Sequence, residues 1–169
     1  MERLIAPALE ALDLETFMRE ALTEADAAGR AGEVPIGAVV VIEGEVVSRG
    51  HPSKNRTRNQ IRHAELNAIL GGGEPLWRNY EKAVLFTTVE PCPLCLGAAV
   101  MADIPHIIYA LPDYNCQSAQ TVSTNAYVQR HIRSYYGGVL MEESAALFNK
   151  YDPDTLQYIS KPIGQAQLE

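Results

Sequence analysis

Apolar residues recur at helical spacing in the first part of the chain. Between residues 14 and 30 they fall at every third or fourth position, and Asp13 stands in front of them as a suitable N-cap. This periodicity predicts an amphipathic helix. Two runs rich in β-branched residues follow at positions 36–42 and 45–49, with Glu43 and Gly44 between them. Two such runs around a two-residue turn predict a β-hairpin.

Strands and helices alternate through the rest of the chain. After a loop at residues 50–61, we expect a helix from residue 62 or 63 to residue 70, where a run of glycines ends it. The pattern then predicts a strand at 83–89, a helix at 92–102 that starts from Pro91, a strand at 106–110 and a helix at 141–148. Residues 113–133 fit a loop, a short helix or a strand. A hairpin followed by this alternation predicts an α/β fold, with helices on both faces of a mixed sheet.

The composition is that of a globular protein. The chain has 169 residues, of which 47% are hydrophobic and 21% are charged. A chain of this length buries roughly 70% of its unfolded surface, so we expect a single domain over residues 1–169. The apolar runs are much shorter than the roughly 20 residues that span a bilayer, and the first residues do not have the pattern of a signal peptide. We therefore expect a cytoplasmic protein.

The charge is acidic overall but basic in one segment. Lys and Arg total 14 against 21 Asp and Glu, which gives a net charge of −7. Such a chain does not attract nucleic acid unless it has a local basic patch. Residues 51–62 contain Lys54, Arg56, Arg58 and Arg62 and no acidic residue. This segment can bind the phosphates of a nucleotide or of an RNA loop, although a solvated surface loop explains the charges as well.

The candidate chemistry lies in two short motifs that each open a predicted helix. One is His63-Ala64-Glu65 and the other is Pro91-Cys92-Pro93-Leu94-Cys95. The two cysteines are three residues apart, so they share one helical face, and the first turn of a helix favours the thiolate that binds zinc. His63 supplies a third ligand, which leaves the fourth tetrahedral position open, as in catalytic zinc sites. The chain has an odd number of cysteines, 3, which also argues for a reducing compartment rather than a disulfide scaffold.

Glu65 fits the role of a proton carrier beside such a metal. It follows His63 by two positions, about 200° around the helix, and so is badly placed to share the ion. A carboxylate near a zinc-activated water can accept its proton and deliver it to a substrate nitrogen. The order H-x-E and then P-C-x-x-C is the signature of zinc-dependent nucleobase deaminases.

Each motif alone also has a simpler interpretation. A single C-x-x-C occurs in structural zinc half-sites and in redox pairs, although no thioredoxin-like pattern surrounds this one. A closed structural site needs a fourth ligand, for which Cys116, His51, His106 or His131 are the candidates. Those four residues also fit ordinary surface or core positions.

Taken together, the motifs resemble those of the cytidine deaminase-like superfamily, in the branch of bacterial tRNA adenosine deaminase, guanine deaminase and yeast-type cytosine deaminase. The resemblance covers about residues 14–150 and includes residues 33–39 and 85–92. It implies a three-layer α/β/α sandwich with a five-stranded mixed sheet, and commonly a homodimer. It also implies zinc as the cofactor, with His63, Cys92 and Cys95 as its ligands and Glu65 as the proton shuttle.

The resemblance further implies substrate contacts from backbone groups of Ala64 and Glu90. The chain departs from the family pattern at Pro52, which stands where many relatives have an Asn that hydrogen-bonds the base or ribose. Proline has no side-chain donor. Asn55 and Asn59 are the candidates to replace that contact, and a changed donor would change the heterocycle that the pocket accepts.

Two later segments are candidates for closing the pocket. Tyr114, in the loop after the strand at 106–110, can stack on a substrate ring. The tail from about residue 152 can form a lid, with Asp154 or Tyr158 reaching in, as in some relatives. A plain surface tail explains the same residues.

The sequence favours a small heterocycle as the substrate. Residues 141–169 contain only Lys150 and Lys161 as basic residues, whereas tRNA-acting relatives end in a basic helix, and residues 90–98 and 101–105 resemble guanine and cytosine deaminases. We therefore expect a zinc-dependent hydrolase that deaminates a free nucleobase or related heterocycle (guanine, cytosine, isoguanine or s-triazine type) and releases ammonia. The alternatives are a tRNA-specific adenosine deaminase, with nucleic acid as its partner, and a catalytically silent zinc subunit, against which Glu65 argues.

Overall fold

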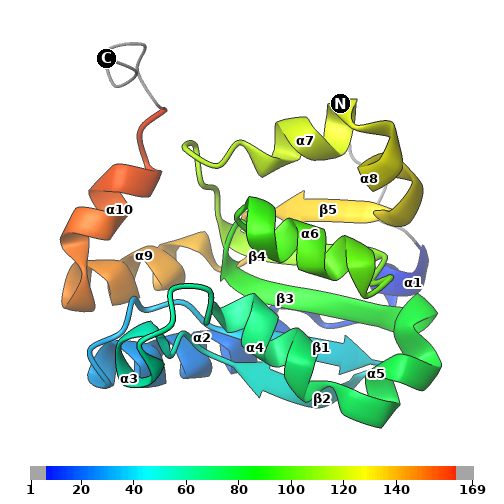
Figure 1. The fold of residues 1–169 in the computed structure, drawn as a ribbon, viewed down its shortest axis with the longest axis horizontal. Coiled ribbons are helices and arrows are strands. Elements are labelled where there is room, and N and C mark those ends of the chain that lie inside the picture. Colours follow the sequence, from blue (N-terminus) through cyan, green and yellow to red (C-terminus); the bar gives the residue numbers. More distant parts are fainter. Residues whose placement is uncertain (1–6, 163–169) are drawn as a thin grey trace.

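A five-stranded mixed sheet forms the centre of the molecule (Figure 1). The computed structural model describes residues 7–162, and within them the strands lie in the order β2-β1-β3-β4-β5. β1 pairs antiparallel with β2 and β3, whereas β4 runs parallel to β3 and β5. The strands are β1 (Ala38–Ile42), β2 (Glu45–Gly50), β3 (Ala83–Val89), β4 (His106–Leu111) and β5 (Ser134–Gly137).

Helices cover both faces of this sheet, which confirms the predicted α/β/α sandwich. On one face lie α4 (Ala64–Gly71) and α6 (Pro93–Met101), and on the other lie α2 (Leu14–Arg30) and α9 (Met141–Tyr151) (Figure 1). The remaining helices are α1 (Pro7–Glu10), α3 (Lys54–Thr57), α5 (Gly73–Asn79), the 3-10 helix η1 (Tyr80–Lys82), α7 (Ser118–Thr124), α8 (Ala126–His131) and α10 (Pro153–Ile159).

The strand β1 shows how the sequence supplies two hydrophobic layers at once. All of its residues are buried, because helices pack against both sides of the sheet. Successive side chains of a strand point to opposite faces. Ala38, Val40 and Ile42 therefore join the core under α4 and α6, while Val39 and Val41 join the core under α2.

Local signals set several of the predicted boundaries. The hairpin turn is confirmed: Glu43 and Gly44 both have positive φ, 52° and 83°, as a two-residue hairpin turn requires. Asp13 caps α2 by accepting a hydrogen bond from the Thr16 N–H, as predicted. The helix predicted from Pro91 begins two residues later, at Pro93, because Cys92 takes the N-cap position.

The hydrophobic pattern does not predict α5, β5 or α10. Gly73 has a φ of 48°, so the chain changes direction after α4 and starts a new helix instead of a loop. β5 is short and depends on pairing with β4, which no local pattern reports. α10 follows Asp152, whose side chain accepts a hydrogen bond from the Thr155 N–H. The ambiguous segment 113–133 contains a loop, α7 and α8.

No helix in residues 7–162 is long and apolar enough to cross a membrane. The expected domain, residues 1–169, extends beyond the described residues at both ends. The expected lid, from about residue 152, coincides with α10.

Candidate active site

The two sequence motifs meet beside the ends of β2 and β3. His63 is the N-cap residue of α4, and Cys92 is the N-cap residue of α6, with Pro93 at the first helical position where proline is favoured. Gly50, the last residue of β2, lets α4 approach closely, since a Cβ there would lie 2.3 Å from the carbonyl oxygen of Ala64. This close packing brings the start of α4 next to the start of α6.

His63, Cys92 and Cys95 form a compact set of donor atoms. Nδ1 of His63 lies 3.5 Å from Sγ of Cys92 and 3.5 Å from Sγ of Cys95. The ligand atoms of the three residues all lie within 4.8 Å of one another. In a tetrahedral zinc site with Zn–S bonds of about 2.3 Å and Zn–N bonds of about 2.0 Å, nitrogen and sulfur are about 3.5 Å apart. The donor set therefore fits zinc in both chemistry and spacing.

The electrostatics of this cluster favour a thiolate at Cys92. A hydrogen bond with the Cys95 side chain, helped by His63, lowers the pKa of Cys92 to about 4. The hydrogen bond with Cys92 in turn raises the pKa of His63. The thiolate is the form of cysteine that binds metal, so one ligand is already in its binding form at neutral pH.

Glu65 lies beside the donor set and is almost completely buried. Its side chain is 4% exposed, and its Oε2 accepts a hydrogen bond from the Cys95 thiol at 3.4 Å. Burial raises the pKa of the Glu65 carboxyl above its ordinary value. A carboxyl group with a raised pKa can both accept and release a proton at moderate pH, which general acid–base catalysis requires.

No fourth protein ligand accompanies the set within residues 7–162, because each candidate is bound elsewhere. The Cys116 thiol donates to Oδ2 of Asp113 at 3.0 Å. The ring nitrogens of the three other histidines contact polar oxygens of their own. These pairs are His51 with Glu24 at 2.7 Å, His106 with Ser134 at 2.9 Å and His131 with Asp103 at 3.0 Å. The arrangement matches an open site rather than a closed structural one.

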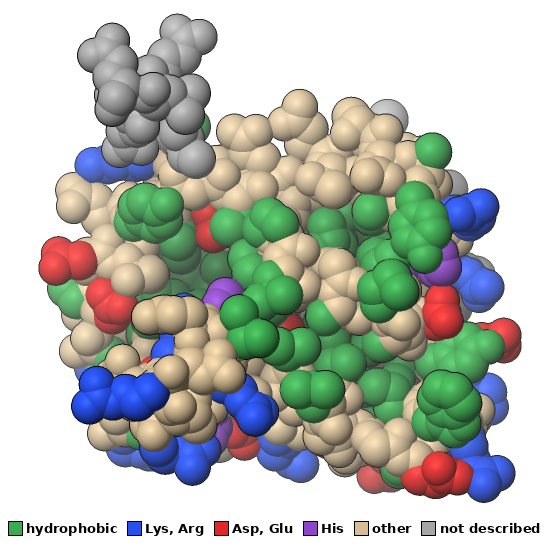
Figure 2. Space-filling model, in the orientation of Figure 1, with side chains coloured by type: hydrophobic (Ala, Val, Ile, Leu, Met, Phe, Trp, Pro, Cys, Tyr) green, Lys and Arg blue, Asp and Glu red, His purple; other side chains and the backbone are tan. Residues whose placement is uncertain are grey.

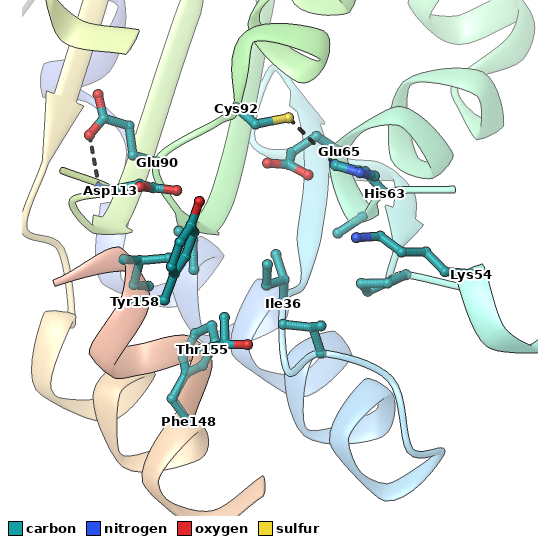
Figure 3. A pocket seen from close by; sticks show the side chains of 15 residues that line it. Ile36, Lys54, His63, Glu65, Glu90, Cys92, Asp113, Phe148, Thr155 and Tyr158 are labelled. Carbon is teal, nitrogen blue, oxygen red and sulfur yellow. Dashed lines mark hydrogen bonds between the residues drawn. The ribbon is translucent and has the colours of Figure 1, made fainter. Parts of the chain in front are cut away.

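A cavity of about 340 Å³ opens next to the donor set (Figure 3). At one end lie His63, Glu65 and Cys92, and at the opposite end lie Thr155 and Tyr158 of α10. Its other lining residues are Val34, Ile36, Pro52, Lys54, Ala64, Val89, Glu90, Asp113, Phe148 and Ile159. Apolar side chains make up much of this wall, and polar groups lie at both of its ends. Ligand sites in proteins commonly have this character.

The structure brings some predicted substrate contacts to the cavity and not others. Ala64 and Glu90 line it, as does Pro52. Asn55 is absent from the lining, because its side chain donates to the Gly32 carbonyl at 3.0 Å. Asn59 is also absent, and its side chain accepts from the N–H of Ile61.

Tyr114 likewise lies outside the lining, and its side chain is 51% exposed. Its backbone N–H instead donates to the Ile159 carbonyl at 2.9 Å, while the Asn115 side chain donates to the Tyr158 carbonyl. The loop that contains Tyr114 therefore holds α10 against the cavity. Of the two tail residues named from the sequence, Tyr158 lines the cavity and Asp154 does not.

The side chain of Glu90 stabilises the wall of the cavity. Oε1 accepts hydrogen bonds from the Ala119 N–H at 2.8 Å and the Tyr135 hydroxyl at 3.1 Å, and Oε2 accepts from the Asp113 N–H at 3.0 Å. These bonds tie the end of β3 to the loop after β4, to α7 and to β5. Sequence reasoning missed this role, because all three donors lie more than 20 residues away.

Sequence reasoning also missed Lys54, Asp113 and Phe148 as cavity residues. Lys54 belongs to the basic run that the sequence singles out, but nothing in that run indicates that its first member reaches the cavity. Its amine lies on the His63 side of the cavity (Figure 3). Asp113 lies two residues after the end of β4, and in α/β sheets the carboxyl ends of strands commonly border the site.

Comparison with known proteins gives one family match and several relatives. Residues 12–111, which are 100 of the 169 residues, match the cytidine and deoxycytidylate deaminase zinc-binding region. A Bacillus subtilis (strain 168) protein named tRNA-specific adenosine deaminase is 36% identical over 141 residues, 81% of this chain and 87% of that protein.

Two solved structures resemble most of the chain. One comes from a study of A-to-I editing by tRNA:A34 deaminases at the wobble position of transfer RNA. It has a TM-score of 0.65 and 31% identity, covering 78% of this chain and 98% of that one. The other is guanine deaminase from Bacillus subtilis, with a TM-score of 0.54 and 30% identity, covering 69% of this chain and 74% of that one.

Proposed function

Because this chain belongs to the cytidine and deoxycytidylate deaminase zinc-binding family, we propose that it is a tRNA-specific adenosine deaminase that converts adenosine to inosine. The observation that carries the proposal is the buried Glu65 beside the His63, Cys92 and Cys95 donor set, in a chain 36% identical to a tRNA-specific adenosine deaminase. The reaction class is hydrolytic: adenosine and water give inosine and ammonia.

The prediction of a free nucleobase as substrate, with a small-molecule base as partner, is contradicted by these relatives. The 36% identical protein from Bacillus subtilis is named a tRNA-specific adenosine deaminase, and the 31% identical structure comes from a study of tRNA:A34 deaminases. The prediction relied on the resemblance of residues 90–98 and 101–105 to base deaminases, and on two quantities, the net charge and the few basic residues near the C-terminus. Neither quantity reports the charge beside the cavity, where Lys54 lies.

We assign the metal ligands to His63, Cys92 and Cys95, whose spacing fits zinc. Bound zinc would supply a Lewis acid that lowers the pKa of water to about 7 and so provides a nucleophile at neutral pH. The cluster is matched to this ion, since thiolates and imidazole are its usual protein ligands.

Glu65 moves the protons of the reaction. Its carboxylate accepts a proton from the attacking water as the new carbon–oxygen bond forms at the carbon that bears the amine. The same carboxyl then gives that proton to the adjacent ring nitrogen. A second proton, from the new hydroxyl group, passes through Glu65 to the amine, which leaves as ammonia. Burial keeps bulk water away from these transfers and raises the pKa of the carboxyl, which makes the carboxylate a stronger base toward the attacking water.

The residues that line the cavity orient the target base. A target base must leave its stack and enter a pocket that contacts its edge and its faces. In this proposal, backbone groups of Ala64 and Glu90 contact the edge, and Tyr158 of α10 contacts a face. Pro52 offers no side-chain hydrogen bond, so shape and apolar contact carry more of the recognition.

The experiment that tests the proposal is inosine formation in a tRNA anticodon stem-loop by the zinc-loaded protein. We expect inosine and ammonia in equal amounts from the parent protein. The Glu65→Gln variant should lose about 10²–10⁴-fold in rate while keeping its zinc, because the amide has the size of the carboxyl but cannot transfer the proton. The Glu15→Gln variant, altered at an exposed helix position, is the matched control and should keep the parent rate.

Other outcomes would overturn parts of the proposal. Release of ammonia from guanine, cytosine or isoguanine with no inosine in the stem-loop would exclude the tRNA assignment. If neither the parent nor Glu65→Gln releases ammonia from any of these substrates, although both hold zinc, the protein is a catalytically silent zinc subunit.

A further inference from the structure

The four basic residues of segment 51–62 lack acidic partners. Lys54, Arg56, Arg58 and Arg62 form no ion pair within residues 7–162. Six other basic residues do form ion pairs: Arg19, Arg30, Arg49, Arg78, Lys82 and Lys150. Segment 51–62 thus has a charge of +4 in a chain whose net charge is −7, so the other residues together carry −11.

These basic side chains gather on one part of the surface. Figure 2 shows Lys and Arg side chains clustered where Figure 1 places α3. Arg56, Arg58 and Arg62 are exposed, and Lys54 is half-buried. Unpaired, exposed guanidinium groups keep their full attraction for an anion, because no neighbouring carboxylate has to be displaced first.

The backbone of the segment is held in place by buried polar groups. The carboxylate of Glu33, which is 8% exposed, accepts hydrogen bonds from the N–H groups of Asn55 at 2.8 Å and Arg56 at 3.2 Å. The two ends of the segment are joined by a hydrogen bond from the Ser53 N–H to the Arg62 carbonyl at 3.0 Å. The segment is therefore a preformed surface, which reduces the entropy lost when it binds a ligand.

The segment connects the active-site cavity to a second hollow. Lys54 lines the cavity that contains His63. Arg56 and Arg62 line a second groove of about 470 Å³, whose other polar lining includes Arg49, Ser53, Asn67, and Glu24 in contact with His51. Three of the four basic residues therefore line either the cavity or the groove.

We propose that this basic segment binds the phosphate backbone of the single-stranded RNA that flanks the target nucleoside. The inference rests on the proposed function and specifies its RNA-binding surface. Lys54 contacts a phosphate next to the nucleoside that enters the cavity, and Arg56 and Arg62 contact phosphates along the groove. A flipped nucleoside needs its neighbouring backbone held, and backbone contacts of this kind are made by Lys and Arg regardless of base sequence.

The test is binding of a fluorescein-labelled tRNA anticodon stem-loop, followed by anisotropy at different salt concentrations. The three contacts to single-stranded RNA predict a slope of log K against log salt of about −2.1, or about 18-fold weaker binding at 200 mM than at 50 mM salt. A quadruple variant with Lys54→Gln, Arg56→Gln, Arg58→Gln and Arg62→Gln should bring the slope close to zero.

A second quadruple variant provides a control of equal charge. Arg19→Gln, Arg30→Gln, Arg78→Gln and Lys150→Gln also remove four positive charges, but from side chains that already have acidic partners. We expect this control to keep at least three quarters of the parent slope. Circular dichroism and zinc content of both variants show whether they are folded and metal-loaded.

The outcomes separate this inference from the proposed function. If the parent forms inosine but the first quadruple variant keeps the parent slope, the proposed RNA-binding surface is refuted and the proposed function is supported. If the parent binds RNA with a steep slope that this variant loses, yet no inosine forms, the RNA-binding surface is supported and the proposed function is refuted. If adenosine monophosphate binds through these residues and RNA does not bind, the surface holds a single nucleotide phosphate and the RNA proposal is overturned.

Discussion

The three cysteines of this chain lie in different surroundings, which give their thiols different properties. Cys92 and Cys95 share the donor set with His63, whereas Cys116 donates a hydrogen bond to Asp113. Burial, together with Asp113, raises the pKa of Cys116, so its thiol stays protonated. A protonated thiol is a poor metal ligand and a weak nucleophile.

This contrast leads to a prediction about zinc content. Cys95→Ser should lose most of the roughly one zinc ion per chain, because a serine hydroxyl is not a zinc ligand of comparable strength. Cys116→Ser should keep the full metal content, since a hydroxyl can make the same hydrogen bond to Asp113. Metal analysis of the purified variants checks both. Equal zinc in the two variants would exclude Cys95 as a ligand.

His106, which does not line the active-site cavity, makes the free energy of unfolding depend on pH. Its side chain is 4% exposed, and burial, with a smaller contribution from Arg133, lowers its pKa below 6.5. In acid the unfolded chain therefore binds a proton that the folded chain does not bind. The stability that His106 contributes is present above about pH 6.5 and is lost as the pH falls below that value.

We therefore expect the thermal midpoint of the parent to fall more between about pH 7.5 and pH 5.5 than that of His106→Gln. The amide does not titrate and can still hydrogen-bond Ser134. Differential scanning fluorimetry of both proteins at the two pH values measures the difference. Identical falls in the two proteins would show that the imidazole has the same pKa in the folded and unfolded states.

Among the elements, α10 shows how much of the cavity depends on the end of the described chain. Its residues Thr155, Tyr158 and Ile159 line the cavity, and Ile159 packs in the same cluster as Phe148 of α9. The loop after β4 holds α10 through two hydrogen bonds, from the Tyr114 N–H to the Ile159 carbonyl and from the Asn115 side chain to the Tyr158 carbonyl. The helix is therefore part of the cavity wall.

Replacing Tyr158 tests whether its ring contacts the base. Tyr158→Ala should raise KM at least five-fold with little change in kcat, because stacking of an aromatic ring on a base contributes about 1–3 kcal/mol. Tyr158→Phe keeps the ring and should resemble the parent. Steady-state inosine formation by the three proteins gives both constants. A similar loss in both variants would assign the effect to the hydroxyl group instead.

Element boundaries followed the sequence where a local signal exists. The β1–β2 turn and the cap of α2 depend on residues within a few positions, so propensity and capping rules predict them, and they place the starts of α4 and α6 within one or two residues. β5 and α5 were harder to predict from the sequence. β5 forms by hydrogen bonding with β4, which the local sequence does not show. α5 begins at Gly73, whose positive φ usually marks the end of a helix.

On the scale of the whole molecule, the proposed zinc site connects the two motifs and the two helices that carry them. α4 and α6 pack on the same face of the sheet, and a metal held by His63, Cys92 and Cys95 would join their N-terminal ends. A ligand that binds the folded state alone stabilises it by about 2.7 kcal/mol at 100 times its Kd.

Removing the metal should therefore lower the thermal midpoint of the whole domain. For a chain of this size we expect a fall of about 5–10 °C in the presence of EDTA, reversed by adding zinc. Calorimetry of the parent measures the shift, and Cys95→Ser should show almost none. An unchanged midpoint in the parent would mean that the donor set does not hold zinc under those conditions.

The sequence by itself determined the two motifs, the helices they open and the family to which they belong, because capping, periodicity and ligand spacing are local properties. Only the tertiary structure decided that His63 lies 3.5 Å from Cys92, 29 residues away, and that α10 lines the cavity. It also decided that Glu90 binds its neighbours through its carboxylate and that Asn55 and Tyr114 lie outside the cavity lining. These contacts join residues far apart in the chain. They arise from the packing of helices on the sheet, which no short sequence window contains.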